Sequence, residues 1–224
     1  FDDYQLVRDV ERKSEKYSAK HKKNALKSKG GKGGPQSIMR IYSRQFSNFV
    51  FPEEIPRPFA KPGLSIVKIK EDLIKGKSNN KSVIKDMVKE EEIVSNTELS
   101  KKYMQRLNKT LKKLSKNKEK YLKDEPNKLQ KYSPKMKAIL DNINKSEGLV
   151  FVYSQFTSVE GSAIFSMVLE ANGYAPFGSS SNKPKFALYS GSVDYKKRKE
   201  IIDTFTSSKN KNGKDLKIIL ASAA

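Results

Sequence analysis

The chain has 224 residues, and its 46 lysines and arginines outnumber 25 aspartates and glutamates, which gives a formal net charge of +21. An excess of this size attracts polyanions, chiefly nucleic acid or an anionic membrane surface, although a lysine-rich solubilising surface gives the same number. Cysteine is absent and His21 is the only histidine, which excludes disulfides, thiolate metal sites and cysteine nucleophiles, and argues against any metal site or histidine-based triad.

The first 63 residues are predicted to be a connector. A charged helical stretch opens the chain, and residues 27–35 contain only lysine, serine, glycine and proline, which predicts a flexible linker because nothing there can be buried. Residues 38–63 are rich in aromatic residues, and the four prolines between positions 52 and 62 forbid a helix there. We therefore expect residues 38–63 to form an extended segment that lies across another surface.

Residues 64–132 are predicted to form a basic helical insertion. Apolar residues recur there at helical spacing, as a narrow stripe made of Met104, Leu107, Leu111, Leu114 and Tyr121. Lysines surround the stripe, and a possible basic patch consists of Lys109, Lys112, Lys113 and Lys116. Two interpretations stay open. The lysines could grip a phosphate backbone, or they could be the solvated face of a packed helix.

Capping signals mark the starts of three helices in the last third of the chain. Ser133 is expected to cap the first helix, with Pro134 at its first position. Thr157 and Glu160 have the spacing of a capping box, which would open the second helix. Asp194 is expected to cap the third helix. The second and third helices are predicted near residues 159–172 and 194–206.

Three apolar runs between these helices have the composition of strands buried in a parallel sheet. They are residues 149–154, 185–190 and 216–222. The alternation of strands and helices predicts an α/β fold in which the three strands are parallel neighbours with right-handed crossovers. Ligands of such sheets meet the loops at the carboxyl ends of the strands. The candidate site therefore lies in the small, polar stretches 154–157, 190–192 and 222–224.

Three segments of this region carry a family resemblance through their order and spacing. Residues 149–157 (LVFVYSQFT) are followed by a glycine, Gly191, then Arg198 seven positions later and Phe205, and finally by residues 218–224 (IILASAA). In chain order, these segments resemble three motifs. The first is motif IV, the second is a block in which a glycine is followed by six residues, an arginine and then a phenylalanine, and the third is the opening of motif V. These motifs are features of the second motor domain of superfamily 2 helicases and translocases, in the form that Swi/Snf-type translocases use.

Two further features are similar to the helicases of large nucleocytoplasmic DNA viruses, which include the poxvirus-type early transcription factor and nucleoside triphosphatase helicases. Residues 42–52 (YSRQFSNFVFP) resemble a block that usually joins the two motor domains of that group. Residues 133–137 (SPKMK) resemble the phrase that precedes its motif IV. With these features, the resemblance covers most of the chain except the linker and the basic helical region.

The resemblance implies a partial RecA-like sheet that holds the backbone of nucleic acid without reading bases, through hydroxyls and backbone N–H groups. The implied contacts are Ser154, Gln155 and Thr157 in the first segment, Ser190 and Gly191 in the second, and Ser222 and Ala223 in the third. The same serines and threonine could instead cap helices and turns. Arg198 could anchor its helix to the sheet or to a carboxylate rather than touch substrate.

The implied organisation is a connector at residues 1–63, the insertion at 64–132 and a RecA-like domain at 133–224 that stops within motif V, so we expect the chain to be a fragment. Nucleotide hydrolysis in the family requires a phosphate loop, Mg²⁺ ligands and an arginine finger. Gly76, Lys77 and Ser78 imitate the end of a phosphate loop, but Glu71 stands where its first glycine is required. We therefore expect no catalytic residue in the fragment, and ATP and Mg²⁺ only in a full-length protein.

The expected partners are DNA or RNA, the first motor domain of the same polypeptide and viral transcription machinery. No apolar run approaches the roughly 18 residues of a membrane span, so we expect no membrane partner and an intracellular location, in the host cytoplasm or a virion. One alternative is a non-catalytic transcription-factor or virion subunit that keeps the motor fold for binding. Another is a purely structural, basic DNA-packaging segment.

Overall fold

The computed structural model describes residues 4–9, 11–12, 41–59, 97–126, 128–157 and 159–222. The chain divides into two compact units, of which the first comprises residues 1–47 and 53–112 and the second residues 48–52 and 113–224. The predicted linker at 27–35, the Gly76–Ser78 segment and the rest of the insertion before residue 97 lie outside the described residues.

Helix α2 (Ile41–Asn48) belongs mainly to the first unit and was not expected, because residues 38–63 were predicted to be extended. All four prolines lie after this helix ends, so they do not restrict it. Burial stabilises it instead, since Phe46 is only 5% exposed and the Ser43 backbone N–H donates to Glu11 Oε1 at 3.0 Å. Residues 49–59 have no regular helix or strand, as expected.

Arg57 contacts several side chains of the first unit. The Arg57 guanidinium lies 4.7 Å from the centre of the Phe59 ring and 5.7 Å from that of Phe46, and it donates to Gln45 Oε1 at 2.9 Å. Arg106 of helix α5 (Thr97–Lys116) donates to the Phe59 carbonyl at 3.1 Å. Together these contacts join α2, the proline-rich segment and α5.

Helix α5 buries part of the apolar stripe that the sequence predicted. Leu107 and Leu114 are 2% and 0% exposed, and Tyr121, which follows in the short helix α6 (Lys118–Tyr121), is 4% exposed. Met104 was also assigned to the stripe but is 45% exposed. The helical prediction is therefore confirmed over the described residues, with its buried face shorter than expected.

The second unit is built on a four-stranded sheet in the order β1-β4-β3-β2, and all its strand pairs are parallel. The strands are β1 (Val150–Ser154), β2 (Ala175–Pro176), β3 (Lys185–Tyr189) and β4 (Ile218–Ser222). The three predicted strands are neighbours, which confirms the α/β, RecA-like parallel sheet. β2 was not predicted, because two residues carry no periodic pattern.

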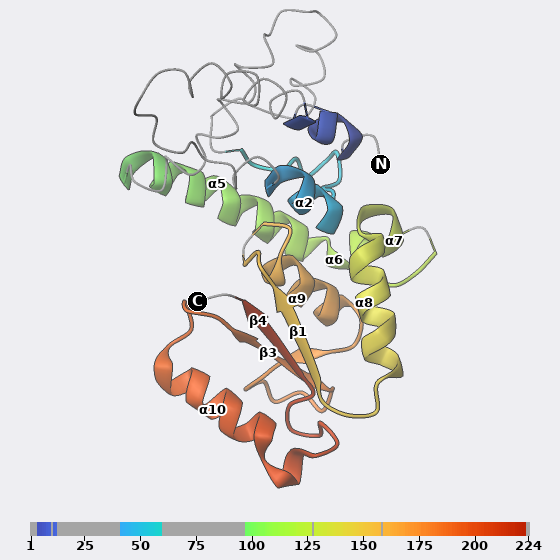
Figure 1. Cartoon of the computed structure of the whole chain (residues 1–224), viewed down its shortest axis with the longest axis vertical. Helices are drawn as coiled ribbons and strands as arrows, with labels where there is room; N and C mark the ends of the chain where they lie inside the picture. The colour runs from blue at the N-terminus through green and yellow to red at the C-terminus, as the bar shows by residue number, and fades with distance from the viewer. Residues whose placement is uncertain are drawn as a thin grey trace, which may run out of the picture. The chain divides into compact units, whose positions relative to one another are not determined.

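Helices lie against both faces of this sheet (Figure 1). On one face Ile201 of α10 packs in a cluster with Ala187, Ile219 and Ala221. Successive side chains of a strand alternate between faces, so Phe186 points to the opposite face, where α9 contacts β3 and β4. The remaining bounds are α7 (Leu129–Tyr132), α8 (Pro134–Lys145), α9 (Ser162–Ala171), α10 (Tyr195–Thr206) and the 3₁₀ turn Ser208–Asn210.

Two of the predicted helix caps are confirmed. Ser133 Oγ accepts a hydrogen bond from the Met136 backbone N–H at 3.0 Å, and Pro134 is the first residue of α8. Asp194 Oδ1 accepts from the Lys196 backbone N–H at 2.9 Å at the start of α10. Each side chain satisfies one of the N–H groups that a helix leaves unpaired in its first turn.

Strand β1 differs from its prediction, because its apolar run was expected to be buried. It lies at the edge of the described sheet, and Phe151 and Tyr153 are 63% and 60% exposed. The described residues contain no helix that is both long and apolar enough to cross a membrane.

Candidate nucleic-acid interface

The carboxyl ends of three strands meet at one edge of the sheet, because β1, β4 and β3 are parallel neighbours. Ser154 at the end of β1 pairs with Ser222 at the end of β4. Tyr189 pairs with Ala221, so Ser190, which follows β3, adjoins Ser222 in the same register. The structure therefore brings the three predicted segments together, although they lie up to about 70 residues apart in the sequence.

Two of the hydroxyls at this edge hold turns in place. Ser154 Oγ donates to the Phe156 carbonyl at 2.8 Å and accepts from the Phe156 N–H at 3.2 Å. Ser190 Oγ and Ser192 Oγ lie 2.8 Å apart and share a hydrogen bond. Ser222 Oγ is buried and has no hydrogen-bond partner within the described part of the chain. Ser154 therefore caps a turn, as one interpretation expected, whereas Ser190 bonds to a neighbouring hydroxyl.

The exposed members of the predicted set are Gln155, Thr157 and Gly191. They lie in the loops that follow β1 and β3, where backbone N–H groups and the Thr157 hydroxyl can reach a phosphate. Ala223 lies outside the described residues.

The loop after β1 does not contain the predicted capping box. α9 begins at Ser162, its N-cap is Gly161, and no side chain caps it. The chain instead turns through Glu160, which is fully buried at φ 52°, and the Phe156 carbonyl accepts from both the N–H and the hydroxyl of Ser162, at 3.0 and 3.2 Å. A backbone carbonyl thus takes the place of the predicted side-chain cap, and Thr157 is exposed.

An asparagine from the connector fixes the same loop. Asn48 Nδ2 donates to the Glu160 carbonyl at 3.1 Å, and Asn48 Oδ1 accepts from Lys135 Nζ at 2.7 Å. The Asn48 carbonyl in turn accepts from Ser133 Oγ. Sequence reasoning singled out the connector block but not this residue, since no local pattern announces a contact 112 positions away.

The start of α10 concentrates positive charge beside the candidate edge. Lys197 forms an ion pair with Glu200 at 2.9 Å and lies 4.8 Å from the centre of the Phe177 ring. Arg198 Nε is buried without a hydrogen-bond partner, and within the described residues Arg198 forms no ion pair. The expected carboxylate anchor of Arg198 is therefore not found there. Arg198 is half-buried, and an anchor of its helix to the sheet stays a prediction.

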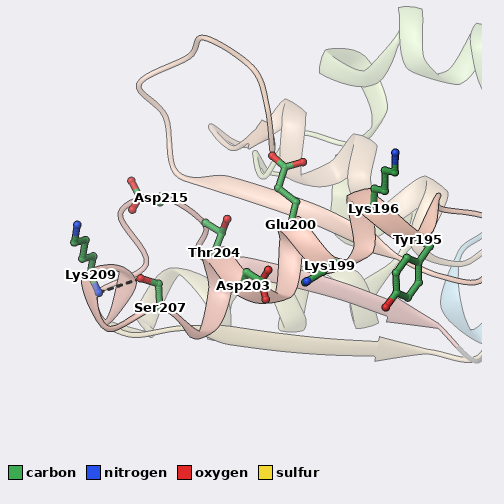
Figure 2. A pocket seen from close by; sticks show the side chains of 9 residues that line it. All are labelled: Tyr195, Lys196, Lys199, Glu200, Asp203, Thr204, Ser207, Lys209 and Asp215. Atoms are coloured by element: carbon green, nitrogen blue, oxygen red, sulfur yellow. Dashed lines mark hydrogen bonds between the residues drawn. The ribbon is translucent and has the colours of Figure 1, made fainter.

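A separate hollow of about 620 Å³ lies along α10 and the turn that follows it (Figure 2). It is lined by Tyr195, Lys196, Lys199, Glu200, Asp203, Thr204, Ser207, Lys209 and Asp215. Lysines and carboxylates alternate around it, so it lacks the single sign of charge that phosphate binding favours. None of the predicted contacts line it, and no group of metal-ligating side chains occurs in the part of the chain that the structure describes.

The fold is α/β and RecA-like, and polar residues lie at the carboxyl ends of three of its strands. Over 98 residues, 43% of this chain, the sequence is 34% identical to a protein of Acanthamoeba polyphaga mimivirus named "Putative ATP-dependent RNA helicase". The match covers 17% of that protein's length, so it supports a helicase relationship over a limited region. No family model matches the chain, and no solved structure matches it.

Proposed function

We propose that the second unit is the part of an ATP-dependent nucleic-acid helicase or translocase that grips the nucleic-acid backbone. The observation that carries the proposal is the register that places Ser222 of the central strand β4 between Ser154 on one side and Ser190 on the other. The partial similarity to a protein named as a helicase supports it. The gripping surface is the loop edge that contains Gln155, Thr157, Ser190 and Gly191.

The chemistry of this edge suits a phosphate backbone better than bases. Hydroxyls and backbone N–H groups donate to phosphate oxygens whatever the sequence, so a motor can move along the strand while it holds on. The amino end of α10 adds a partial positive charge and two exposed cations, Lys196 and Lys199. This mechanism does not require a deep pocket that recognises a base.

ATP and Mg²⁺ are assigned to a longer polypeptide that also contains the first motor domain. In the family that the sequence resembles, the phosphate loop and the Mg²⁺ ligands lie on the first motor domain, so we place nucleotide chemistry in the other parts of that polypeptide. Within it, the chain's role is to hold and release the backbone. DNA or RNA is the substrate, and viral transcription or genome handling in the host cytoplasm or the virion is the process to which we assign it.

The edge is tested with the variant Thr157→Val plus Ser190→Ala, which removes two hydroxyls and little volume. We expect its affinity for a labelled single-stranded oligonucleotide to fall about tenfold, the effect of one or two lost hydrogen bonds. The matched control is Thr206→Val plus Ser208→Ala, the same chemical changes near the amino ends of the strands, where α10 terminates. An equal loss in both variants, or none in the first, contradicts the proposed edge.

A further inference from the structure

We propose that α5 carries a second nucleic-acid-binding surface, separate from the strand-end edge. It consists of Lys101, Lys109, Lys112 and Lys116, which we call the α5 lysine face. The proposal takes its partner class, nucleic acid, from the proposed function, but its residues and its test do not depend on the strand-end edge.

The four lysines share one side of the helix. At about 100° per residue, their positions cluster opposite Leu107 and Leu114, the residues that α5 buries to 2% and 0% exposure. All four are exposed, and Lys113, also part of the predicted basic patch, is exposed at the margin of this face. The apolar side therefore anchors the helix and turns the lysines to solvent.

Within the described residues these four lysines have no acidic partner, a property that they share with other exposed lysines such as Lys145 and Lys183. Five lysines of the second unit do pair with carboxylates: Lys118 with Glu170, Lys123 with Glu125, Lys128 with Glu125, Lys137 with Asp141, and Lys197 with Glu200. Within the described residues none of the four side chains of the α5 lysine face forms an ion pair or a hydrogen bond. The sequence of α5 holds seven basic residues and one acidic residue, so neighbours on the helix cannot neutralise them.

This arrangement costs helix stability. Like charges four positions apart, as in Lys112 and Lys116, destabilise a helix slightly. A helix face that serves only solubility can alternate lysine with glutamate, because opposite charges four positions apart stabilise the helix. An uncompensated row of cations instead produces a local positive potential, which a polyanion neutralises.

The dimensions of the face fit a phosphate backbone. From Lys101 to Lys116 the helix rises about 22 Å, and successive phosphates of one strand follow about every 3.4 Å along a duplex axis, so the face can meet several of them. Lysine is a flexible point charge that reads neither base nor sugar. We therefore assign this surface to sequence-independent binding of both DNA and RNA.

The test compares two variants of the 224-residue chain that lose the same charge. The first replaces Lys101, Lys109, Lys112 and Lys116 by Gln, whose helix propensity is close to that of lysine. The control replaces four exposed lysines that precede the strands, Lys145, Lys183, Lys211 and Lys214, by Gln. Affinity for labelled DNA and RNA, each as a duplex and a single strand, is measured at several salt concentrations.

Each phosphate contact that is lost lowers the slope of log affinity against log salt by about 0.9 for a duplex and about 0.7 for a single strand. We expect the α5 variant to lose about three units of slope on a duplex with an unchanged melting temperature, and the control to lose less than one. Equal losses in the two variants, or no loss in the α5 variant because the face binds an acidic protein instead, overturn the proposal.

Failure of the proposed function gives a different result. The Thr157→Val plus Ser190→Ala variant removes no charge, so its effect is a loss of affinity at an unchanged salt slope. If that loss is absent while the α5 variant still loses slope, the strand-end edge is wrong and the α5 surface stands. If the loss is present and the α5 slope is unchanged, the α5 surface is wrong.

Discussion

A single glycine determines the shape of the loop that presents Gln155 and Thr157. A Cβ atom placed on Gly161 would lie 1.9 Å from the Phe156 carbonyl oxygen, the same oxygen that accepts the first hydrogen bonds of α9. A backbone atom cannot move aside as the end of a flexible side chain can. The requirement for glycine at this position is therefore steric rather than conformational, since its φ of −129° is open to any residue.

We expect Gly161→Ala to lower the free energy of unfolding by about 1–3 kcal/mol, the usual cost of an added group in a filled space. Gly148→Ala is the matched control, because a Cβ at Gly148 meets nothing within 4 Å. Urea denaturation of both variants measures the difference. A cost for Gly161→Ala no larger than that of Gly148→Ala contradicts the described loop geometry.

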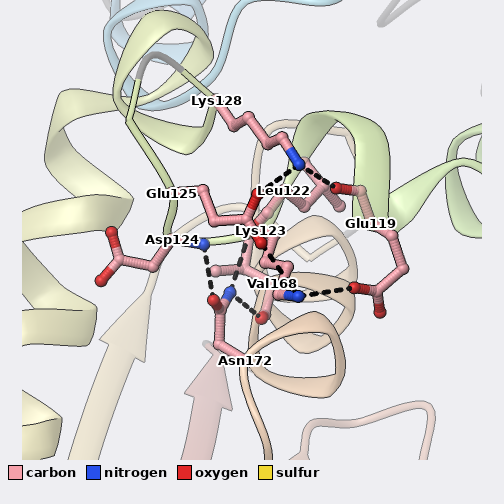
Figure 3. Close-up of polar contacts among 8 residues, drawn as sticks. All are labelled: Glu119, Leu122, Lys123, Asp124, Glu125, Lys128, Val168 and Asn172. Atoms are coloured by element: carbon pink, nitrogen blue, oxygen red, sulfur yellow. Dashed lines mark hydrogen bonds and ion pairs between the residues drawn. The ribbon is translucent and has the colours of Figure 1, made fainter.

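Asn172 joins the turn after α6 to the end of α9 (Figure 3). Its Oδ1 accepts from the Asp124 N–H at 2.6 Å, and its Nδ2 donates to the carbonyls of Leu122 and Val168 at 2.9 and 2.7 Å. We expect Asn172→Ala to destabilise the chain by about 2–4 kcal/mol, because it removes three hydrogen bonds and leaves their backbone partners unpaired.

The control for Asn172 is Asn142→Ala, an exposed position on α8. The two changes remove the same amide group, so the difference between their denaturation midpoints isolates the three hydrogen bonds. If the midpoints of the two variants agree, Asn172 does not hold the two segments together.

At the scale of elements, the segment between α6 and α7 contains an ion-pair network with a defined pH response. Hydrogen bonds from Lys128 and then Lys123 lower the pKa of Glu125 below its ordinary value of 4.5. A carboxylate whose folded pKa is lowered stabilises the fold above its unfolded pKa, and this stabilisation is lost as the pH falls through the lowered folded pKa.

We therefore expect the melting temperature of the wild type to exceed that of Glu125→Gln at pH 7. This difference in melting temperature should shrink below pH 4.5 as the carboxylate takes up its proton. The effect is modest and decreases with salt, because the network is largely exposed. Thermal melts of both proteins from pH 7 to pH 3 measure it. A difference that stays constant over this range contradicts the ion-pair network.

The sequence predicted elements well where the signal was local. Apolar runs located β1, β3 and β4, and the caps Ser133 and Asp194 were confirmed, because each signal lies within a few residues of the feature it sets. The failures had non-local causes. α2 depends on the burial of Phe46, β2 on pairing with β3, and the false capping box on a turn through Glu160 that the spacing alone does not reveal.

At the scale of the whole molecule, the candidate edge followed from topology. Once three strands are parallel neighbours, their carboxyl ends must meet, so the gathering of Ser154, Ser190 and Ser222 could be predicted without contacts. The contact of Asn48 with the Glu160 carbonyl could not, because it joins positions 112 residues apart through one side chain. The hydrogen-bond partner of each hydroxyl also escaped prediction, since hydrogen bonds within a turn depend on the exact path of the backbone.

The last prediction concerns nucleotide turnover. Hydrolysis of ATP by a motor of this kind requires a loop of backbone N–H groups around the phosphates, carboxylate ligands for Mg²⁺ and a positioned arginine. The sequence has no complete phosphate loop, and in the family that it resembles the loop and the Mg²⁺ ligands lie on the first motor domain. The many lysines do not replace these parts, because an unpositioned lysine supplies charge without the geometry that stabilises a transition state. We therefore expect this chain to release no phosphate from ATP with or without DNA or RNA, while a polypeptide that joins it to the first motor domain releases phosphate faster when nucleic acid is added. Activity in the chain alone would overturn the assignment of its second unit, and a silent longer protein that still binds nucleic acid would favour the non-catalytic subunit.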